Sequence, residues 1–188
     1  MYRMKLIVWL GNPGKQYQNT RHNIWFRILD FFVDQEKIWE FIYNNKWKSE
    51  IIQWDYLDEK IICLKPMEFM NRSGGPIDQI MNFYKIDPQN LLVIHDDIDL
   101  PTSKIQLRLG WSSAGHNWLK DIIEKIWTKD FWRIRIGVDR PVNQADVADY
   151  VLDNFKNDEI NLIENKMDDI KKLIEDFIKN TNLLLLSK

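Results

Sequence analysis

The sequence predicts a single α/β sandwich domain in which strands and helices alternate along the chain. Short apolar runs bounded by turn residues indicate strands, and longer stretches with apolar residues every three or four positions indicate helices. With 188 residues, of which 45% are hydrophobic and 29% charged, the chain is long enough to enclose one core. No repeat, low-complexity tract or linker-like stretch divides it, so we expect one domain over residues 1–188.

Six segments are predicted to be strands because each is a short apolar run flanked by turn or polar residues. They are MKLIVWL at 4–10, SEIIQW at 49–54, KIICLK at 60–65, LLVIHD at 91–96, KIQLRL at 104–109 and FWRIRIGV at 131–138.

Four segments have a helical period and follow polar loops. They are His22 to about Val33, Gly74 to Tyr84, Asn117 to Ile126, and one long amphipathic helix from Asp158 whose apolar stripe continues to Ile178. Ser73 is expected to be the N-cap of the second helix, with Pro76 in its first turn.

The composition says more about the cellular compartment than about the binding partners. The formal net charge of −2 gives no global argument for or against nucleic acid, so such a partner must contact a local basic patch. The only cysteine, Cys63, lies in an apolar run and favours a buried thiol in a reducing compartment. The five apolar residues before Gly11 are too few for a signal-peptide core, and the final NLLLLSK is too short for a membrane anchor. We expect a cytoplasmic protein with no membrane association.

All three histidines fall in polar loops at the ends of predicted strands or helices, where α/β domains place their sites. They occur in TRHN, VIHDDIDLP and AGHN. His22 stands at a helix entrance between an arginine and an asparagine, and nothing in the pattern there requires a buried histidine. We therefore interpret His22 as functional.

The segment LLVIHDDIDLP places His95 and the carboxylates of Asp96, Asp97 and Asp99 directly after a strand. Imidazole and carboxylates also bind divalent ions, but no HxH, HxxxH or CxxC spacing accompanies them, so a metal-dependent hydrolase is the weaker alternative. A carboxylate can instead accept a proton from an imidazole ring and fix its tautomer. We predict that Asp96 pairs with His22 in this way.

The sequence has no GxSxG nucleophile elbow, and Cys63 is expected to be buried, so a covalent intermediate lacks a nucleophile. The simplest remaining chemistry is a water molecule, activated by His22, that attacks a carbonyl. Asn12, Asn71 and Asn117 each lie in a loop beside small residues, where they could orient the carbonyl and its developing charge. Each could equally be a turn or cap residue.

Five motifs, in order, resemble those of the bacterial-type peptidyl-tRNA hydrolase family. They are LIVWLGNPGKQYQNTRHN, KPMEFMNRSG, HDDIDLP, GWSSAGHNWLK and FWRIRIGVDRP, and they span residues 4–141. The resemblance implies a three-layer α/β/α domain with a twisted mixed sheet and no metal or organic cofactor. It implies cleavage of the ester between a peptide and the 3′ ribose of tRNA. We expect a monomer whose partner is peptidyl-tRNA, with no obligate protein partner.

The resemblance also implies roles for single residues. His22 matches the general base and Asp96 the acid that keeps it proton-accepting, while Asn12 matches the residue that separates N-blocked from free aminoacyl substrates. Arg108 and Arg135 match positions that meet tRNA phosphates, although solvated strand-end charges would give the same pattern. Four further residues match positions that hold the tRNA end and the peptide: Tyr17, Phe69, Asn71 and Asn117.

The chain has nine tryptophans but only seven glycines. Five tryptophans fall where the family motifs ordinarily have glycine: Trp9, Trp25, Trp111, Trp118 and Trp127. Glycine serves where φ is positive or where another backbone approaches closely, and an indole suits neither place. UGA is read as tryptophan in one variant genetic code and as glycine in another, so we hypothesise that these five codons are UGA and encode glycine.

Genuine tryptophans would favour a different function. If they fill the cleft, the alternative is a non-catalytic tRNA-end-binding protein of the same fold. Two further departures from the family pattern do not fit the codon hypothesis: Arg72 replaces an apolar residue, and Ser103 stands where glycine is frequent.

Overall fold

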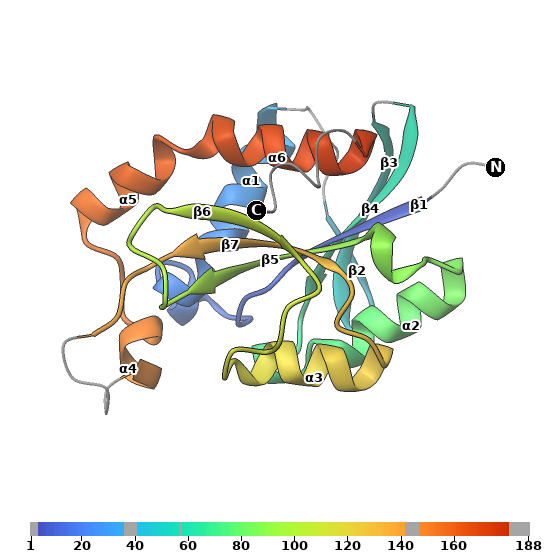
Figure 1. The fold of residues 1–188 in the computed structure, drawn as a ribbon, viewed down its shortest axis with the longest axis horizontal. Coiled ribbons are helices and arrows are strands. Elements are labelled where there is room, and N and C mark those ends of the chain that lie inside the picture. Colours follow the sequence, from blue (N-terminus) through green and yellow to red (C-terminus); the bar gives the residue numbers. More distant parts are fainter. Residues whose placement is uncertain (1–3, 36–40, 57, 142–146, 181–188) are drawn as a thin grey trace.

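The computed structural model describes residues 4–35, 41–56, 58–141 and 147–180. A seven-stranded mixed sheet with strand order β2-β3-β4-β1-β5-β7-β6 runs through the molecule, with helices on both of its faces (Figure 1). The predicted α/β class with a three-layer arrangement is therefore confirmed. The NLLLLSK run considered as a membrane anchor lies outside the described residues. Among the helices that the structure describes, none has the length and apolar character needed to cross a bilayer.

The central strands β1, β4, β5 and β7 are mutually parallel, and β2, β3 and β6 are antiparallel to their neighbours. The strands are β1 Met4–Trp9, β2 Ile42–Asn44, β3 Ser49–Tyr56, β4 Glu59–Pro66, β5 Leu91–Asp97, β6 Ile105–Leu109 and β7 Trp132–Gly137. All six predicted strands are present. The short edge strand β2 was missed because its Ile42 and Tyr43 side chains are exposed and so give no alternation of buried and exposed positions.

The described residues also form six α-helices and four 3₁₀ turns, and the last three helices follow β7. The helices are α1 Ile24–Gln35, α2 Gly74–Tyr84, α3 Asn117–Ile126, α4 Val147–Leu152, α5 Asn157–Glu164 and α6 Met167–Lys179. The 3₁₀ turns are η1 Lys15–Tyr17, η2 Arg21–Asn23, η3 Met70–Arg72 and η4 Pro88–Asn90. α2 and α3 match their predictions, whereas the helix predicted from His22 begins with η2 and becomes an α-helix only at Ile24.

The single long helix predicted from Asp158 is wrong. α5 ends at Glu164 and α6 begins at Met167, with a two-residue turn between them. The apolar stripe nevertheless continues, because Ile163 and Met167 are four residues apart and are buried in the same core cluster. A periodicity that runs unbroken through a turn does not reveal the turn, which is why the sequence pattern predicted one helix.

Two hydrophobic cores lie on opposite faces of the sheet. α1 and α6 cover one face, and α2 and α3 cover the other (Figure 1). β1 contributes to both, because Ile7 and Trp9 belong to the first core and Leu6 and Val8 to the second. Side chains of a strand alternate between faces, so a strand buried on both sides reads as a continuous apolar run.

The start of α2 differs from its predicted capping. Ser73 is the N-cap residue by position, but its Oγ donates to the carbonyl oxygen of Met70 at 2.8 Å. The first helical N–H, that of Gly74, instead donates to Oδ2 of Asp121 on α3 at 2.7 Å. A Cβ on Gly74 would lie 2.6 Å from the backbone oxygen of Asp121, so the absence of a side chain lets α2 and α3 pack closely.

Candidate active site

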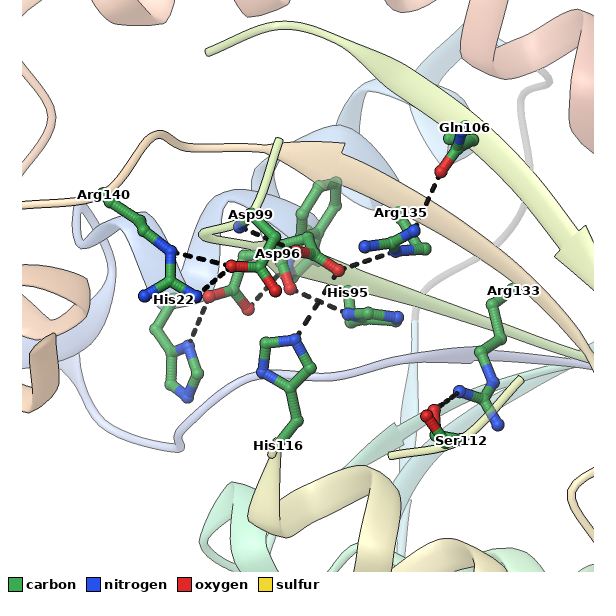
Figure 2. A network of polar contacts seen from close by, with 12 residues as sticks. His22, His95, Asp96, Asp99, Gln106, Ser112, His116, Arg133, Arg135 and Arg140 are labelled. Atoms are coloured by element: carbon green, nitrogen blue, oxygen red, sulfur yellow. Dashed lines mark hydrogen bonds and ion pairs between the residues drawn. The ribbon is translucent and has the colours of Figure 1, made fainter. Parts of the chain in front are cut away.

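His22 and Asp96 form a buried pair at the carboxyl end of β5. His22 Nδ1 lies 2.8 Å from Asp96 Oδ2, and the two residues are 5% and 1% exposed (Figure 2). An ionised carboxylate can only accept, so Nδ1 carries the proton and Nε2 is left with the lone pair of a base. The structure thus brings together the two residues that the sequence pairs.

Two indoles border this pair. The ring of Trp118 meets the ring of His22 edge-on, with centroids 4.7 Å apart, and its centroid also lies 4.6 Å from that of the His116 ring. The Trp25 indole N–H points to the second Asp96 oxygen at 3.5 Å, a long hydrogen bond. Both positions belong to the five where the family motifs ordinarily have glycine.

Arg21 fixes the backbone beside His22, a role that the sequence did not reveal. Its side chain is 5% exposed and forms an ion pair with Glu159 of α5 at 2.9 Å. Its guanidinium also donates to the Tyr150 carbonyl oxygen at 3.2 Å and lies 4.1 Å from the centre of the Tyr150 ring. η2 is therefore attached to the C-terminal helices α4 and α5. In the sequence, the only indication of this contact was the presence of an arginine in the TRHN motif.

Asn12, after β1, is held by a reciprocal pair of hydrogen bonds with Asn23. The Asn12 N–H donates to Asn23 Oδ1 at 2.8 Å, and Asn23 Nδ2 donates to the Asn12 carbonyl oxygen at 2.7 Å. The Asn12 side-chain oxygen accepts from the Met70 N–H at 3.1 Å. Because Oδ1 accepts this bond, the side-chain Nδ2–H groups of Asn12 are the ones that can donate to a substrate.

A cavity of about 540 Å³ opens beside the histidine, and we call it the catalytic cavity. Four predicted site residues line it: Asn12, His22, Asn71 and Asn117. Its apolar wall includes Ile98, Val151 and Leu152. Of the other predicted substrate-binding residues, Tyr17 and Phe69 are not among the described residues that line it, although Phe69 is 60% exposed next to η3.

The two predicted phosphate-binding arginines do not line the catalytic cavity. Arg135 Nε donates to Asp97 Oδ2 at 2.7 Å, its Nη1 donates to Gln106 at 2.8 Å, and the side chain is only 11% exposed (Figure 2). The Arg108 guanidinium on β6 lies 5.3 Å from the centre of the Trp111 ring. Their phosphate role stays a prediction.

Arg140, in the DRP end of the last motif, is the arginine that lines the catalytic cavity. Its guanidinium pairs with the Asp99 carboxylate, and its side chain is 50% exposed. Arg140 was not among the predicted site residues, and its position two residues after the strand predicted at 131–138 was the available signal.

The loop before α3 is fixed by hydrogen bonds from Arg133, a residue of β7. Arg133 is 1% exposed and donates to the carbonyl oxygens of Trp111 at 2.6 Å and Ser112 at 2.8 Å. Burial, and then the charge of Arg135, lower the pKa of Arg133 to about 10, so it stays protonated at neutral pH. These bonds fix the loop that leads into His116.

The other two histidines have different surroundings. His95 is fully buried, and burial lowers its pKa to about 3, so its neutral ring donates Nδ1–H to the Asp96 carbonyl oxygen at 2.7 Å. His116, the N-cap residue of α3, has Nε2 3.5 Å from Asp97 Oδ2. Burial alone would raise the pKa of Asp97, but His116 and Arg135 together hold it well below its usual range.

The carboxylates at the end of β5 and in the loop after it engage separate partners and do not converge on one point. Asp96 accepts from His22, Asp97 from Arg135, and Asp99 from Arg140. In the described part of the chain, no three His, Cys, Asp or Glu side chains are grouped so that they could hold a metal ion. This arrangement gives no support to the metal-dependent alternative.

Comparison with known proteins identifies the family of this chain. The family model described as peptidyl-tRNA hydrolase matches residues 6–185. The chain belongs to the peptidyl-tRNA hydrolase family.

Relatives and solved structures of the family match almost the whole chain. The peptidyl-tRNA hydrolase of Mycoplasma capricolum is 43% identical over 181 residues, covering 94% of each chain. That of a Wolbachia strain from Drosophila simulans is 44% identical, covering 97% of this chain and 93% of the relative. The crystal structure of peptidyl-tRNA hydrolase from Acinetobacter baumannii has a TM-score of 0.89 and 31% identity, covering 96% of this chain and 91% of that one. Hydrolysis of peptidyl-tRNA is therefore the activity of this chain.

The backbone supports glycine at one of the five tryptophan positions. Trp127 ends α3 with φ 58° and ψ 22°, the left-handed conformation that glycine adopts at helix C-termini, and its side chain is 90% exposed. Ser103, the other departure at a glycine position, has φ 66°. Trp9 and Trp25 are fully buried and do not have positive φ, so the backbone alone does not require glycine there.

We expect the coding DNA to carry UGA at all five positions, and mass spectrometry of the native protein to find glycine there. UGG codons would exclude the hypothesis.

Trp127→Gly should raise the free energy of unfolding by roughly 1 kcal/mol, because the left-handed conformation costs a Cβ-bearing residue about that much. Urea denaturation measures this gain. Lys85→Gly, at the equivalent left-handed position after α2, is the matched control and should give a similar gain.

Proposed function

We propose that His22 is the general base that activates water for hydrolysis of the peptidyl-tRNA ester. The observation that carries this proposal is the 2.8 Å contact between His22 Nδ1 and Asp96 Oδ2. It leaves Nε2 as the proton acceptor and places a buried carboxylate where it stabilises the imidazolium that forms.

The proposed reaction needs no other proton carrier. Nε2 of His22 takes a proton from water as the water oxygen attacks the ester carbonyl carbon. When the bond between that carbon and the 3′ oxygen of the ribose breaks, the imidazolium returns the proton to the leaving oxygen. The products are a free peptide carboxyl group and a tRNA with its 3′ hydroxyl restored, and His22 is neutral again.

Three asparagines are proposed to orient the ester. Asn12, Asn71 and Asn117 all line the catalytic cavity, and a side-chain amide can donate to a carbonyl oxygen as negative charge develops on it. For Asn12 this role is favoured by the bond from the Met70 N–H, which occupies the side-chain oxygen and leaves the amide N–H groups for the substrate.

The setting follows from the family and the predicted chemistry. We propose that the protein acts in the cytoplasm as a monomer, with peptidyl-tRNA as its partner and no cofactor. A tRNA whose 3′ hydroxyl is restored can be aminoacylated again, so this activity serves translation.

The direct test uses the purified protein and N-acetyl-aminoacyl-tRNA, with release of the labelled acyl group as the readout. Multiple turnovers are expected. The alternative, a non-catalytic tRNA-end-binding protein, predicts binding of this substrate without release. Performing the assay on the chain with five tryptophans and on its five-glycine counterpart shows whether the indoles obstruct the site.

Asp96→Asn should preserve the fold and lower kcat by about 10²- to 10⁴-fold, because an amide can hydrogen-bond the imidazole but cannot balance the charge of its protonated form. The pH dependence of kcat should change as well. Asp168→Asn, which removes an exposed carboxylate on α6, is the control and should leave both unchanged. Wild-type kcat and pH dependence in Asp96→Asn would exclude the proposed pairing.

Arg108→Ala should weaken tRNA binding and reduce the slope of log Kd against log salt by about one phosphate contact. Arg135→Ala should do the same, but it also leaves the Asp97 carboxylate without the guanidinium bonded to it in the structure. Fluorescence titrations of tRNA at several salt concentrations measure the slope. A short ester substrate that lacks most of the tRNA is the control. Equal losses on both substrates would contradict a phosphate contact.

A further inference from the structure

The carboxylate of Asp97, the last residue of β5, joins three segments of the chain near the catalytic cavity. Its Oδ2 accepts from Arg135 Nε on β7 at 2.7 Å and lies 3.5 Å from Nε2 of His116, the N-cap residue of α3 (Figure 2). Its Oδ1 accepts from the N–H of Asp99, in the loop after β5, at 2.9 Å. His116 and Asp99 line the catalytic cavity, so this one carboxylate holds two parts of the cavity wall.

Asp97 is buried and charged at the same time. It is 1% exposed, and burial would raise its pKa, but His116 and Arg135 together hold the pKa well below its usual range. Water screens a buried charge poorly, so its attraction for the donors around it is strong. Removal of this charge should therefore loosen the segments that it holds.

The contact with His116 also constrains Asn117. His116 is buried, its N–H donates to the Ser113 carbonyl oxygen at 2.8 Å, and its carbonyl oxygen accepts from the Lys120 N–H at 3.1 Å. Asn117 is the next residue, the first of α3, and lines the catalytic cavity. A planar peptide bond joins the two residues, so a shift of His116 also moves Asn117.

We propose that Asp97 is a positioning residue: its carboxylate holds the His116 ring and thereby sets the direction in which Asn117 donates to the ester carbonyl oxygen. This rests on the proposed function, in which Asn117 orients the ester. A hydrogen bond weakens steeply when its donor is misaligned. A misaligned Asn117 stabilises the charge that develops in the transition state less, while most contacts of the bound tRNA are unaffected.

The first test is Asp97→Asn, which keeps the size of the side chain but has one acceptor oxygen and no charge. With N-acetyl-aminoacyl-tRNA, kcat should fall by about tenfold, the size of a coupling between residues in contact. KM should change by less than about twofold, because the lost interaction belongs to the transition state. Glu175→Gln is the matched control. It neutralises a carboxylate that joins α6 to Tyr56 of β3 at 3.1 Å, and it should leave kcat unchanged.

A double-mutant cycle tests whether Asp97 acts through Asn117. In an Asn117→Ala background, Asp97→Asn should cause no further loss of kcat, because the amide that Asp97 positions is absent. His116→Ala breaks the same link from the other side, so it serves if Asp97→Asn does not fold, and its effect should also vanish in that background. Equal losses in both backgrounds, or wild-type kcat in the single variants, would overturn the proposal.

Amide NMR spectra of the isotope-labelled protein test the positioning without any hydrolysis. The side-chain amide signals of Asn117 should shift in Asp97→Asn and keep their wild-type positions in Glu175→Gln. Such shifts in a protein that does not hydrolyse the ester would support the link from Asp97 to Asn117 and contradict the proposed function. Unshifted Asn117 signals in Asp97→Asn would overturn the link, whatever the activity of the protein.

Discussion

His22→Ala is expected to lower kcat for peptidyl-tRNA hydrolysis by at least about 10²- to 10⁴-fold, the contribution of a positioned general base, and to leave tRNA binding nearly unchanged. The physical reason is the division of roles within the site. Nδ1 of His22 is bonded to Asp96. The free Nε2 is proposed to take the proton of the attacking water, a role that does not require the imidazole to anchor the tRNA.

Single-turnover rates and tRNA affinity, measured separately, check this expectation. His116→Ala is the matched comparison, because it removes the other imidazole that contacts the Trp118 ring, and the partner of that imidazole is Asp97, not Asp96. We expect it to lower the rate much less than His22→Ala does. Near-normal kcat in His22→Ala would overturn the mechanism, and a large loss of tRNA affinity would show that the ring anchors the substrate.

Gly137→Ala is expected to be the most destabilising single methyl addition. A Cβ on Gly137 would lie 1.8 Å from the backbone oxygen of Pro101 and 2.6 Å from that of Leu100. The segment cannot move away easily, because the Gly137 N–H donates to the Lys104 carbonyl oxygen at 2.8 Å and its own carbonyl accepts from the Ser103 N–H at 3.0 Å. The free energy of unfolding should fall by about 3 kcal/mol, which lowers Tm by roughly 6–12 °C.

Thermal and urea unfolding measure this effect. Gly75→Ala is the control, since nothing lies within 4 Å of its Cβ position in α2 and alanine favours a helix by about 1 kcal/mol over glycine. Both variants change the unfolded chain alike, so the difference between them reports the clash. Equal stability of the two variants would mean that the loop after β5 yields to the methyl group.

The sequence predicted the sheet because burial on both faces leaves a continuous apolar run in each central strand. It also predicted the pairing of His22 with Asp96, which are 74 residues apart, because the ends of parallel strands and the loops that follow them meet at one edge of a sheet. The pair could be predicted because an imidazole in a polar loop and a carboxylate at a strand end rarely serve the hydrophobic core, so their positions already indicated a functional role.

Other parts of the site could not be read from one sequence. Arg21 looks like any loop arginine, because its partners Tyr150 and Glu159 belong to helices whose placement no local pattern fixes. Arg135 matched a phosphate-binding position, but its contact with Asp97 depends on which face of β7 the side chain occupies. The break between α5 and α6 could not be predicted either, because the stripe of buried apolar residues continues through it without interruption.

The attachment of Arg21 to Glu159 spans 138 residues of sequence. Synthesis proceeds from the N-terminus at about 5–20 residues per second, so His22 and Asp96 are both made well before the helix that carries Glu159. Contacts of such separation also form late in folding, after the local ones. The emerging chain consequently holds His22 on a turn that lacks its Arg21–Glu159 attachment, and we expect hydrolytic competence to arise only once the last third of the chain has left the ribosome.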